Sequence, residues 1–513
     1  MITIKKLTLL TLLSALVCAL ILPAAGEGVD LTNADITIGY AAASGAKLNP
    51  FLCAERDMLS INALVYEPLF ELDAQMRPRA VLADNWTQDD KTWQIEIRPG
   101  ILFHNGIELS AQDVADSYSL YKQAGEKNPY HARLSLVTSI EATGAYTLAV
   151  TGRYPGMITL YALTFPVVQR GTATTTLPMG TGPYWYIHYQ EDVGARLEAN
   201  PFWWKQQPEI ESIAFRHFYL VSEQLSALQA GEIELFQTRS SAAALTKKLS
   251  YATSLDYTTS AYEMLVPNLS GAMADVRLRK AILYAIDYNT LIANVYLDMA
   301  QQCEVPVPPG SWLYESKSAV YHYSPERALQ YLYDAGWADQ TGNNLLSKVE
   351  GDMLQYISFE IITYDDAASN VRGNAAAQIA ENLRTVGIDA TVVKLTKSEV
   401  SKRLRNGDYD LALVAANLSE IPNLVPLLSE DGALNFSNTA SDETNQLLAA
   451  TVSAADEPAL KAAYSAIQLH IVDELPVMGL CFRTGMLLAT RPLAGLTGVR
   501  EYDAYNGMEF LSK

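Results

Sequence analysis

The pattern of apolar residues between positions 356 and 415 constrains the fold of this chain more than any other feature. Apolar and β-branched residues form three short blocks that fit strands, and segments with helical spacing and glycine stops separate them. The expected elements are a strand at 356–363, a helix at 374–386 before Gly387, a strand at 388–395, a helix from a cap at Ser398 to Asn406 before Gly407, and a strand at 409–415. The order β-α-β-α-β predicts a largely parallel sheet with right-handed crossovers.

A shorter unit of the same kind lies earlier in the chain. It comprises an expected strand at 210–218, a helix at 222–230 that ends at Gly231, and a strand at 233–236. Two α/β units separated in sequence indicate two lobes.

The stretch from Asp73 to Ala173 follows a different pattern. Alternating residues at 93–97 and 146–150 predict strands with one exposed face, and one helix is expected near 111–122. This stretch is therefore interpreted as an α+β insertion. Two further helices are expected. One spans residues 275–297, and the other begins after the cap Ser324 and ends at Gly336.

Acidic side chains dominate the charge of the chain. The 513 residues include 57 Asp and Glu against 37 Lys and Arg, a formal net charge of −20 at pH 7. Such a chain cannot neutralise a phosphate backbone, which excludes a nucleic-acid partner, and it does not suit an anionic membrane surface. At this length the chain should divide into two or three domains.

The N-terminal segment has the pattern of an export signal. Lys5 and Lys6 precede an apolar run from Leu7 to Leu22, and small residues follow as far as Gly26. Residues 1–26 are therefore predicted to be a cleaved signal peptide or an uncleaved N-terminal anchor, and processing as a lipoprotein at Cys18 is a third possibility. Each alternative places the rest of the chain outside the cytoplasm.

The sequence contains no recognisable pattern for catalysis or metal binding. A nucleophile-elbow motif, a His-Glu-x-x-His motif and a Cys-x-x-Cys pair are all absent, and the six histidines are scattered. The glycine-rich run Gly180–Tyr184 lacks the Lys of a phosphate loop and is expected to be a tight turn. We therefore expect no cofactor, no resident metal and no catalytic activity. Cys53, Cys303 and Cys481 allow at most one internal disulfide, whose pairing stays open.

A series of short stretches, in a fixed order along most of the chain, matches one known pattern. They are Val65-Tyr66-Glu67-Pro68-Leu69, Leu82-Ala83-Asp84-Asn85-Trp86, Phe103-His104-Asn105-Gly106, Gly180-Thr181-Gly182-Pro183-Tyr184, Asn200-Pro201-Phe202-Trp203-Trp204 and Gly407-Asp408-Tyr409-Asp410. Taken together they resemble the bacterial extracellular solute-binding proteins of family 5, which serve ABC importers of oligopeptides, dipeptides and sometimes nickel.

The resemblance implies an α/β fold of the type II periplasmic-binding-protein kind, with two α/β lobes, hinge strands and an extra α+β domain. Lobe I would comprise residues 34–71, 179–265 and 485–513, the extra domain residues 72–178, and lobe II residues 266–484. The ligand would lie between the lobes, and its contacts with both of them would favour the closed state.

The function implied by the resemblance is that of an extracytoplasmic binding component which delivers an oligopeptide or peptide-like solute to an ABC transporter permease. A monomer is expected. Three alternatives stay open: a nickel chelate or other non-peptide solute on the same fold, a sensor partner that presents its ligand to a membrane receptor, and an extracellular peptidase.

Ligand contacts can be carried over from the family at a few positions. The segment Ala261–Asn268 matches a crossover strand that pairs with the backbone of a bound peptide, which makes Tyr262 and Met264 candidates for cleft-facing residues, with core packing as the alternative. In the loop Leu48-Asn49-Pro50-Phe51, Asn49 stands where the family usually has Asp, and Phe51 follows it. Glu67 is expected close to the cleft.

One departure from the family concerns the partner of the peptide's amino group. Relatives that bind peptides carry a Trp and an Asp after the strand that ends near Leu413, whereas this chain has Val414-Ala415-Ala416-Asn417-Leu418-Ser419-Glu420. Asn417 is a candidate contact here, and Glu420 is a candidate replacement for the missing Asp. An ammonium group without a carboxylate partner is costly to bury, so either another acid serves or the ligand lacks a free amine.

Overall fold

The computed structural model describes residues 29–244, 246, 250–364, 370–437 and 441–512. The predicted signal or anchor at residues 1–26, with Cys18, lies outside the described residues. Within the described ranges no helix is both long enough and apolar enough to cross a membrane.

A single mixed sheet runs through the molecule and fixes the fold class. In the described residues its strand order is β17-β16-β18-β12-β19-β11-β1-β10-β9-β8, and β13 pairs with β19 to one side of this path. The strands are β1 (Ile36–Ala41), β8 (Tyr184–Gln190), β9 (Gly194–Ala199), β10 (Ser212–Phe218), β11 (Leu235–Thr238), β12 (Thr253–Pro267), β13 (Ala300–Gln302), β16 (Ser358–Tyr364), β17 (Asp389–Leu395), β18 (Leu411–Asn417) and β19 (Met478–Ala489).

One end of this sheet forms lobe I. β1 runs parallel to both β10 and β11, with α6 (Val221–Gln229) as the crossover between them, as the sequence predicts for residues 210–236. Gly231 follows α6 with a φ of +71°, a conformation that favours glycine. α2 (Arg56–Ala63) also belongs to this lobe and leads to the loop that carries Glu67.

The other end forms lobe II and contains the predicted β-α-β-α-β unit. β16 lies parallel to β17 and β18, with α10 (Val371–Thr385) and α11 (Lys397–Asn406) as crossovers. The predicted cap at Ser398 is wrong: the cap of α11 is Thr396, two residues earlier, and its hydroxyl accepts from the Glu399 amide at 3.2 Å. Because the Glu399 carboxylate also accepts from the Thr396 amide, this pair forms a capping box that Ser398 cannot make.

The helix predicted at 275–297 is interrupted. α7 (Val276–Ala285) ends where Ile286 becomes extended, and α8 (Tyr288–Thr290) restarts after it, followed by a π-helical turn at 291–295. The cause is Asp287, whose carboxylate accepts from the Thr290 amide at 3.1 Å and so caps a new helix. α9 (Pro325–Asp334) starts at the predicted cap Ser324, and Gly336 follows it with a φ of +87°.

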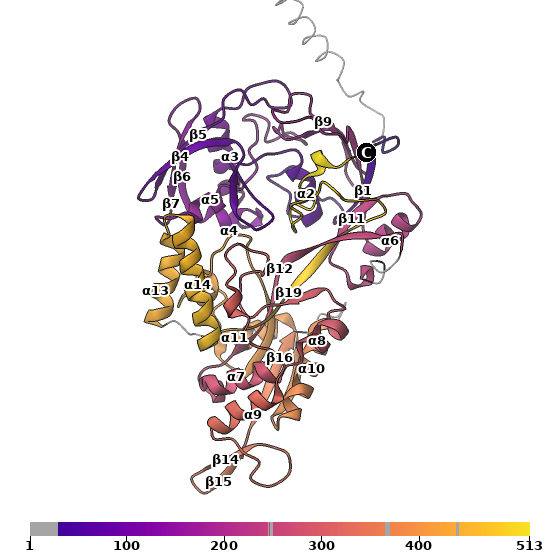
Figure 1. Cartoon of the computed structure of the whole chain (residues 1–513). Coiled ribbons are helices and arrows are strands. Elements are labelled where there is room, and N and C mark those ends of the chain that lie inside the picture. Colours follow the sequence, from indigo (N-terminus) through magenta and orange to yellow (C-terminus); the bar gives the residue numbers. More distant parts are fainter. Residues whose placement is uncertain (1–28, 245, 247–249, 365–369, 438–440, 513) are drawn as a thin grey trace, which may run out of the picture.

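A separate four-stranded antiparallel sheet, in the order β4-β5-β7-β6, marks the extra domain. It lies beside lobe I, and the pair α13–α14 of the C-terminal third packs below it (Figure 1). The remaining described strands and helices are β2 (Phe70–Leu72), β3 (Pro78–Ala80), β4 (Ala83–Asp89), β5 (Thr92–Ile97), β6 (Val137–Ala142), β7 (Thr147–Gly152), β14 (Ser347–Glu350), β15 (Met353–Tyr356), α3 (Ala111–Ala124), α4 (His131–Leu134), α5 (Ile158–Ala162), α12 (Val425–Leu428), α13 (Asp442–Ser453) and α14 (Glu457–Glu474).

Two long strands, β12 and β19, connect the lobes and act as the hinge strands of the fold (Figure 1). They pair antiparallel from Thr253↔Ala489 to Leu265↔Met478, but the register breaks between Thr258 and Tyr262. The break lies at the junction of the lobes, because β18 of lobe II joins β12 only from Ala261 onward. The domain boundaries inferred from the sequence stay a prediction, and lobe I, lobe II and extra domain are used below for those residue ranges.

Candidate functional site

Two adjoining cavities lie where lobe I, lobe II and the extra domain meet. The first has a volume of about 370 Å³ and the second about 240 Å³. Of the residues proposed from sequence, Glu67, Asn417 and Glu420 line the first cavity, and Glu420 also lines the second.

Next to residues that line the first cavity, two backbone segments approach each other closely. A Cβ on Gly180 would lie 2.1 Å from the carbonyl oxygen of Val65, and one on Gly182 would lie 2.6 Å from that of Leu64. The Gly182 amide donates to the Val65 carbonyl at 2.9 Å. The glycine-rich run is therefore a turn fitted against the end of α2, and glycine is required because any side chain would push the two segments apart.

Glu67, which lines the first cavity, is held in place by a dense set of donors. Its carboxylate accepts from the Thr181 hydroxyl at 2.9 Å and from the indole groups of Trp203 (3.2 Å) and Trp204 (3.0 Å). The ammonium group of Lys205 lies 3.7 Å away. Burial raises the pKa of Glu67, while Lys205 and the three donors act in the opposite direction. Glu67 therefore helps to build the wall of the cavity, and few of its acceptor positions remain for a ligand.

Three other carboxylates line the same cavity and have fewer hydrogen-bond or ion-pair partners than Glu67. Burial raises the pKa of Glu71 to about 7, with Lys205 acting to lower it. Within the described residues the Glu71 carboxylate makes no hydrogen bond and has no cation within 4 Å. Burial likewise raises the pKa of Asp503, which pairs with Arg500 at 2.7 Å, and that of Glu509. These acids lie on lobe I and favour a positively charged group inside the cavity.

Glu420 bridges three parts of the molecule. Its carboxylate lies 3.4 Å from the guanidinium of Arg133 in the extra domain and 3.8 Å from that of Arg500 in lobe I. All three side chains are largely buried, with 12–13% of each exposed. The negative charge of Glu420 is therefore already balanced by two cations, and a ligand ammonium would have to compete with them.

Asn417 is the last residue of β18. It pairs with Ala261 of β12 at the junction of the lobes, and its side chain is exposed toward the first cavity. An amide at this position offers both a donor and an acceptor to a ligand.

Asn49 and Phe51 lie away from both cavities and fix the loop before α2. The Asn49 side-chain amide donates to the carbonyls of Ala173 and Thr175 at 2.9 Å each. The ring of Phe51 packs on Tyr121 with a centroid distance of 4.5 Å. Both residues thus attach lobe I to the extra domain, and neither lines the two cavities.

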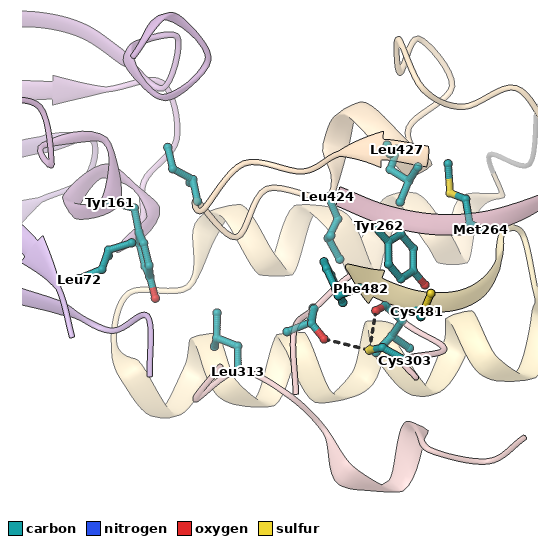
Figure 2. Packing of buried hydrophobic residues seen from close by; sticks show 14 of the residues in the cluster. Leu72, Tyr161, Tyr262, Met264, Cys303, Leu313, Leu424, Leu427, Cys481 and Phe482 are labelled. Atoms are coloured by element: carbon teal, nitrogen blue, oxygen red, sulfur yellow. Dashed lines mark hydrogen bonds between the residues drawn. The ribbon is translucent and has the colours of Figure 1, made fainter. Parts of the chain in front are cut away.

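Tyr262 and Met264 are also placed in the packed interior. They are 0% and 1% exposed, and the Tyr262 ring packs on Phe482 at 4.8 Å, as Figure 2 shows. The strand addition expected of the segment that contains them is wrong. From Tyr262 to Leu265, β12 is paired with β18 on one edge and β19 on the other, so no free edge remains for a peptide.

Several residues of the first cavity have no local signal in the sequence. Lys205 directly follows the Trp203-Trp204 pair of a recognised stretch, and that adjacency is a usable clue. Arg133, Arg500, Asp503 and Glu509 come from segments that match no motif, and only the fold brings them together.

The described cysteines form no disulfide. Cys53, Cys303 and Cys481 are all buried free thiols. The thiol of Cys303 donates to the carbonyls of Val305 and Val307 (Figure 2). In the part of the chain that the structure describes, no group of three or more His, Cys, Asp or Glu side chains is arranged to hold a metal ion.

Two relatives of known function align with most of the chain. The oligopeptide-binding protein AppA of Bacillus subtilis is 22% identical over 471 residues, which is 87% of this chain and 86% of that protein. The nickel-binding periplasmic protein of Escherichia coli is 23% identical over 425 residues, or 78% of each chain.

Solved structures show the same fold. A nickel ABC transporter structure from Bacillus halodurans has a TM-score of 0.79 at 20% identity and covers 91% of this chain and 98% of its own. The structure of AppA from Bacillus subtilis in complex with a nonapeptide has a TM-score of 0.62 at 20% identity, covering 92% and 97%. The arrangement of two lobes, hinge strands and extra domain is thus shared with these proteins.

A family model described as the middle part of the bacterial extracellular solute-binding proteins, family 5, matches residues 77–429. This match covers well over half of the chain and includes Glu420 and Arg133 of the site. The chain belongs to the bacterial extracellular solute-binding proteins of family 5.

Proposed function

We propose that this protein is the substrate-binding component of an ABC importer and captures a short peptide in the two cavities between its lobes. Proteins of this family bind solutes for transport. Several relatives carry the names of oligopeptide-, dipeptide- and di/tripeptide-binding proteins, which supports a peptide as the ligand. The protein acts as a monomer on the outer side of the cell membrane and delivers its ligand to a permease. It performs no catalysis.

The observation that carries the proposal is the excess of negative charge in the first cavity. Five carboxylates line it, and only three cationic side chains balance them. Desolvated carboxylates that lack a partner attract a positive group. The free ammonium group of a peptide is such a group, and Glu71 is its best partner because Glu420 already faces two guanidinium groups.

The peptide backbone has an available partner at the edge of the hinge strand. From Thr253 to Thr258, β12 pairs with β19 alone among the described strands, and β18 joins only from Ala261. Residues 256–260 of this strand line the second cavity. The Ser260 amide and carbonyl are already bonded to Glu501 and Leu418. A peptide that lies beside residues 256–259 gains main-chain hydrogen bonds irrespective of its sequence. Asn417 offers a further polar contact in the first cavity, and Glu67 helps to form the wall of that cavity.

Isothermal titration calorimetry with the tripeptide Ala-Phe-Ala and its N-acetylated form tests this proposal. The free tripeptide is expected to bind, and acetylation is expected to weaken binding at least 10-fold because it removes the charge that the first cavity matches. Glu71→Gln should weaken the free tripeptide and leave the acetylated one unchanged. Glu209→Gln, at an exposed side chain of the same lobe that lines neither cavity, serves as the matched control. If no tripeptide binds, the proposal is contradicted. If only nickel chelates bind, the ligand is a non-peptide solute.

A further inference from the structure

The two cavities are compartments of one space divided by a short wall. The residues that line both of them are Ser260, Leu418, Ser419, Glu420 and Arg500. At this wall the carboxylate of Glu420 lies between Arg133 and Arg500. A ligand that fills both compartments therefore lies across the wall and meets a different chemical environment on each side.

The second cavity is lined by large apolar side chains from three separate parts of the molecule. Met76 and Tyr161 come from the extra domain, Leu313 and Leu424 from loops of lobe II, and Phe482 from the hinge strand β19. Figure 2 shows Tyr161, Leu313, Leu424 and Phe482 among the buried apolar side chains of this region. Since the extra domain and lobe II each contribute part of this lining, the lining is complete only when the extra domain lies against lobe II.

Polar groups near the second cavity are already matched. The hydroxyl of Tyr161 accepts from the indole of Trp312 at 2.9 Å. The carboxylate of Glu501 accepts from Arg239 at 2.6 Å and from the Ser260 amide at 2.7 Å. In contrast with the first cavity, where Glu71 lacks a hydrogen-bond partner among the described residues, this side offers mainly carbon surface to a ligand.

We infer that the second cavity is a side-chain pocket for a large apolar residue of the bound peptide, whose amino group lies in the first cavity. This inference rests on the proposed function and specifies its ligand as a short peptide with a free amine and a Phe- or Leu-sized side chain close to it. The volumes of about 370 Å³ and 240 Å³ are within or just below the range of roughly 300–1,000 Å³ for small-molecule sites, which suits two to four residues.

The size of the expected preference follows from the apolar surface that becomes buried. Transfer of a Leu or Phe side chain from water into such a pocket increases affinity by roughly 10- to 100-fold relative to Ala. Arg500, the cationic side chain that lines this pocket, is already paired with Asp503 and Glu420. A peptide with a carboxylate at the same place should therefore bind more weakly than the Ala peptide.

Titration of the unaltered protein with four tripeptides tests the inference. Ala-Phe-Ala and Ala-Leu-Ala should bind about 10- to 100-fold more tightly than Ala-Ala-Ala, and Ala-Glu-Ala more weakly than all three. If the tripeptides bind with affinities within threefold of one another, the side-chain pocket is refuted while the peptide function stands. If none binds, both fail.

A variant within the pocket provides a second test. Met76→Glu places a carboxylate in the apolar lining at a half-buried turn residue, and Met353→Glu, at a side chain that is 68% exposed on β15, is the matched control. Met76→Glu should abolish the preference for Ala-Phe-Ala over Ala-Ala-Ala and raise the affinity for Ala-Lys-Ala at least fivefold. An unchanged ranking in a variant with normal thermal unfolding overturns the inference. If the variant does not fold, the four-peptide series decides.

Discussion

Gly156 allows the extra domain to contact lobe II, and a single added methyl group should prevent this contact. A Cβ on Gly156 would lie 2.6 Å from the carbonyl oxygen of Val452 and 3.0 Å from that of Ala454, in the segment at the end of α13. Both obstacles are backbone atoms that cannot rotate away. The φ of Gly156 is not positive, so alanine carries no conformational penalty of its own and the effect comes from the contact alone.

The cost of Gly156→Ala can be worked from these distances. Ordinary contact begins at 3.4 Å, so the two backbones must separate by about 0.8 Å. That movement stretches the hydrogen bond from the Met157 amide to the Ala454 carbonyl, now 2.9 Å, beyond useful length. Loss of this bond costs about 1 kcal/mol, and residual overpacking costs roughly another 1 kcal/mol. If ligand binds only when these parts are in contact, a penalty of about 2 kcal/mol weakens the apparent affinity about 30-fold.

Calorimetric titration with Ala-Phe-Ala and small-angle X-ray scattering of the ligand-free protein measure this effect. Gly156→Ala should weaken binding about 30-fold, increase the radius of gyration and leave the thermal unfolding midpoint within a few degrees of normal. The control is Gly271→Ala, where an added Cβ has no atom within 4 Å. An affinity within threefold of the unaltered protein, with normal folding, would refute the reasoning that this contact belongs to the ligand-bound state.

Three further predictions concern stability. Glu71 has a folded-state pKa of about 7 against 4.5 in the unfolded chain. Its ionisation therefore disfavours folding, and stability falls as pH rises from about 4.5 to 7. Glu71→Gln should gain about 3 kcal/mol at pH 8 and nothing at pH 4 in urea titrations; a gain that is equal at both pH values contradicts the assignment. Glu263→Gln leaves Arg372, now bound bidentately at 2.8 and 2.9 Å, without its carboxylate partner and should cost roughly 3–5 kcal/mol by chemical denaturation, whereas a cost below 1 kcal/mol would show the pair to be dispensable. Thr396→Ala should cost about 1 kcal/mol through loss of the α11 cap, and Ser398→Ala less than about 0.5 kcal/mol; the reverse order would restore the cap predicted from sequence.

Much of the fold can be predicted from local patterns in the sequence. The parallel unit at β16, β17 and β18 follows from blocks of β-branched residues separated by helical spacing, and each glycine stop marks a helix end with a positive φ, as at Gly387 and Gly407. Prediction fails where two local signals compete. Asp287 follows an apolar helical pattern, but its side chain caps a new helix and so ends the one before it.

The site is less predictable because it is made by contacts between distant segments. The sequence makes Glu420 a candidate partner for a ligand amine, but nothing near Glu420 in sequence predicts its contacts with Arg133 and Arg500, which lie 287 and 80 positions away. Tyr262 is of a residue type that often contacts ligands. It is buried nevertheless, because its strand β12 is paired with β18 on one edge and with β19 on the other. Periodicity predicts which residues are buried, and only the assembled fold shows whether they are buried by protein or next to a cavity.

The most direct test of the account is a crystal structure of the protein grown with Ala-Phe-Ala. The tripeptide should lie between the lobes, with its ammonium within hydrogen-bond distance of Glu71 and its phenyl ring between Tyr161 and Phe482. A tripeptide bound elsewhere, or bound here with its ammonium on Glu420 and its ring in the first cavity, would contradict the account.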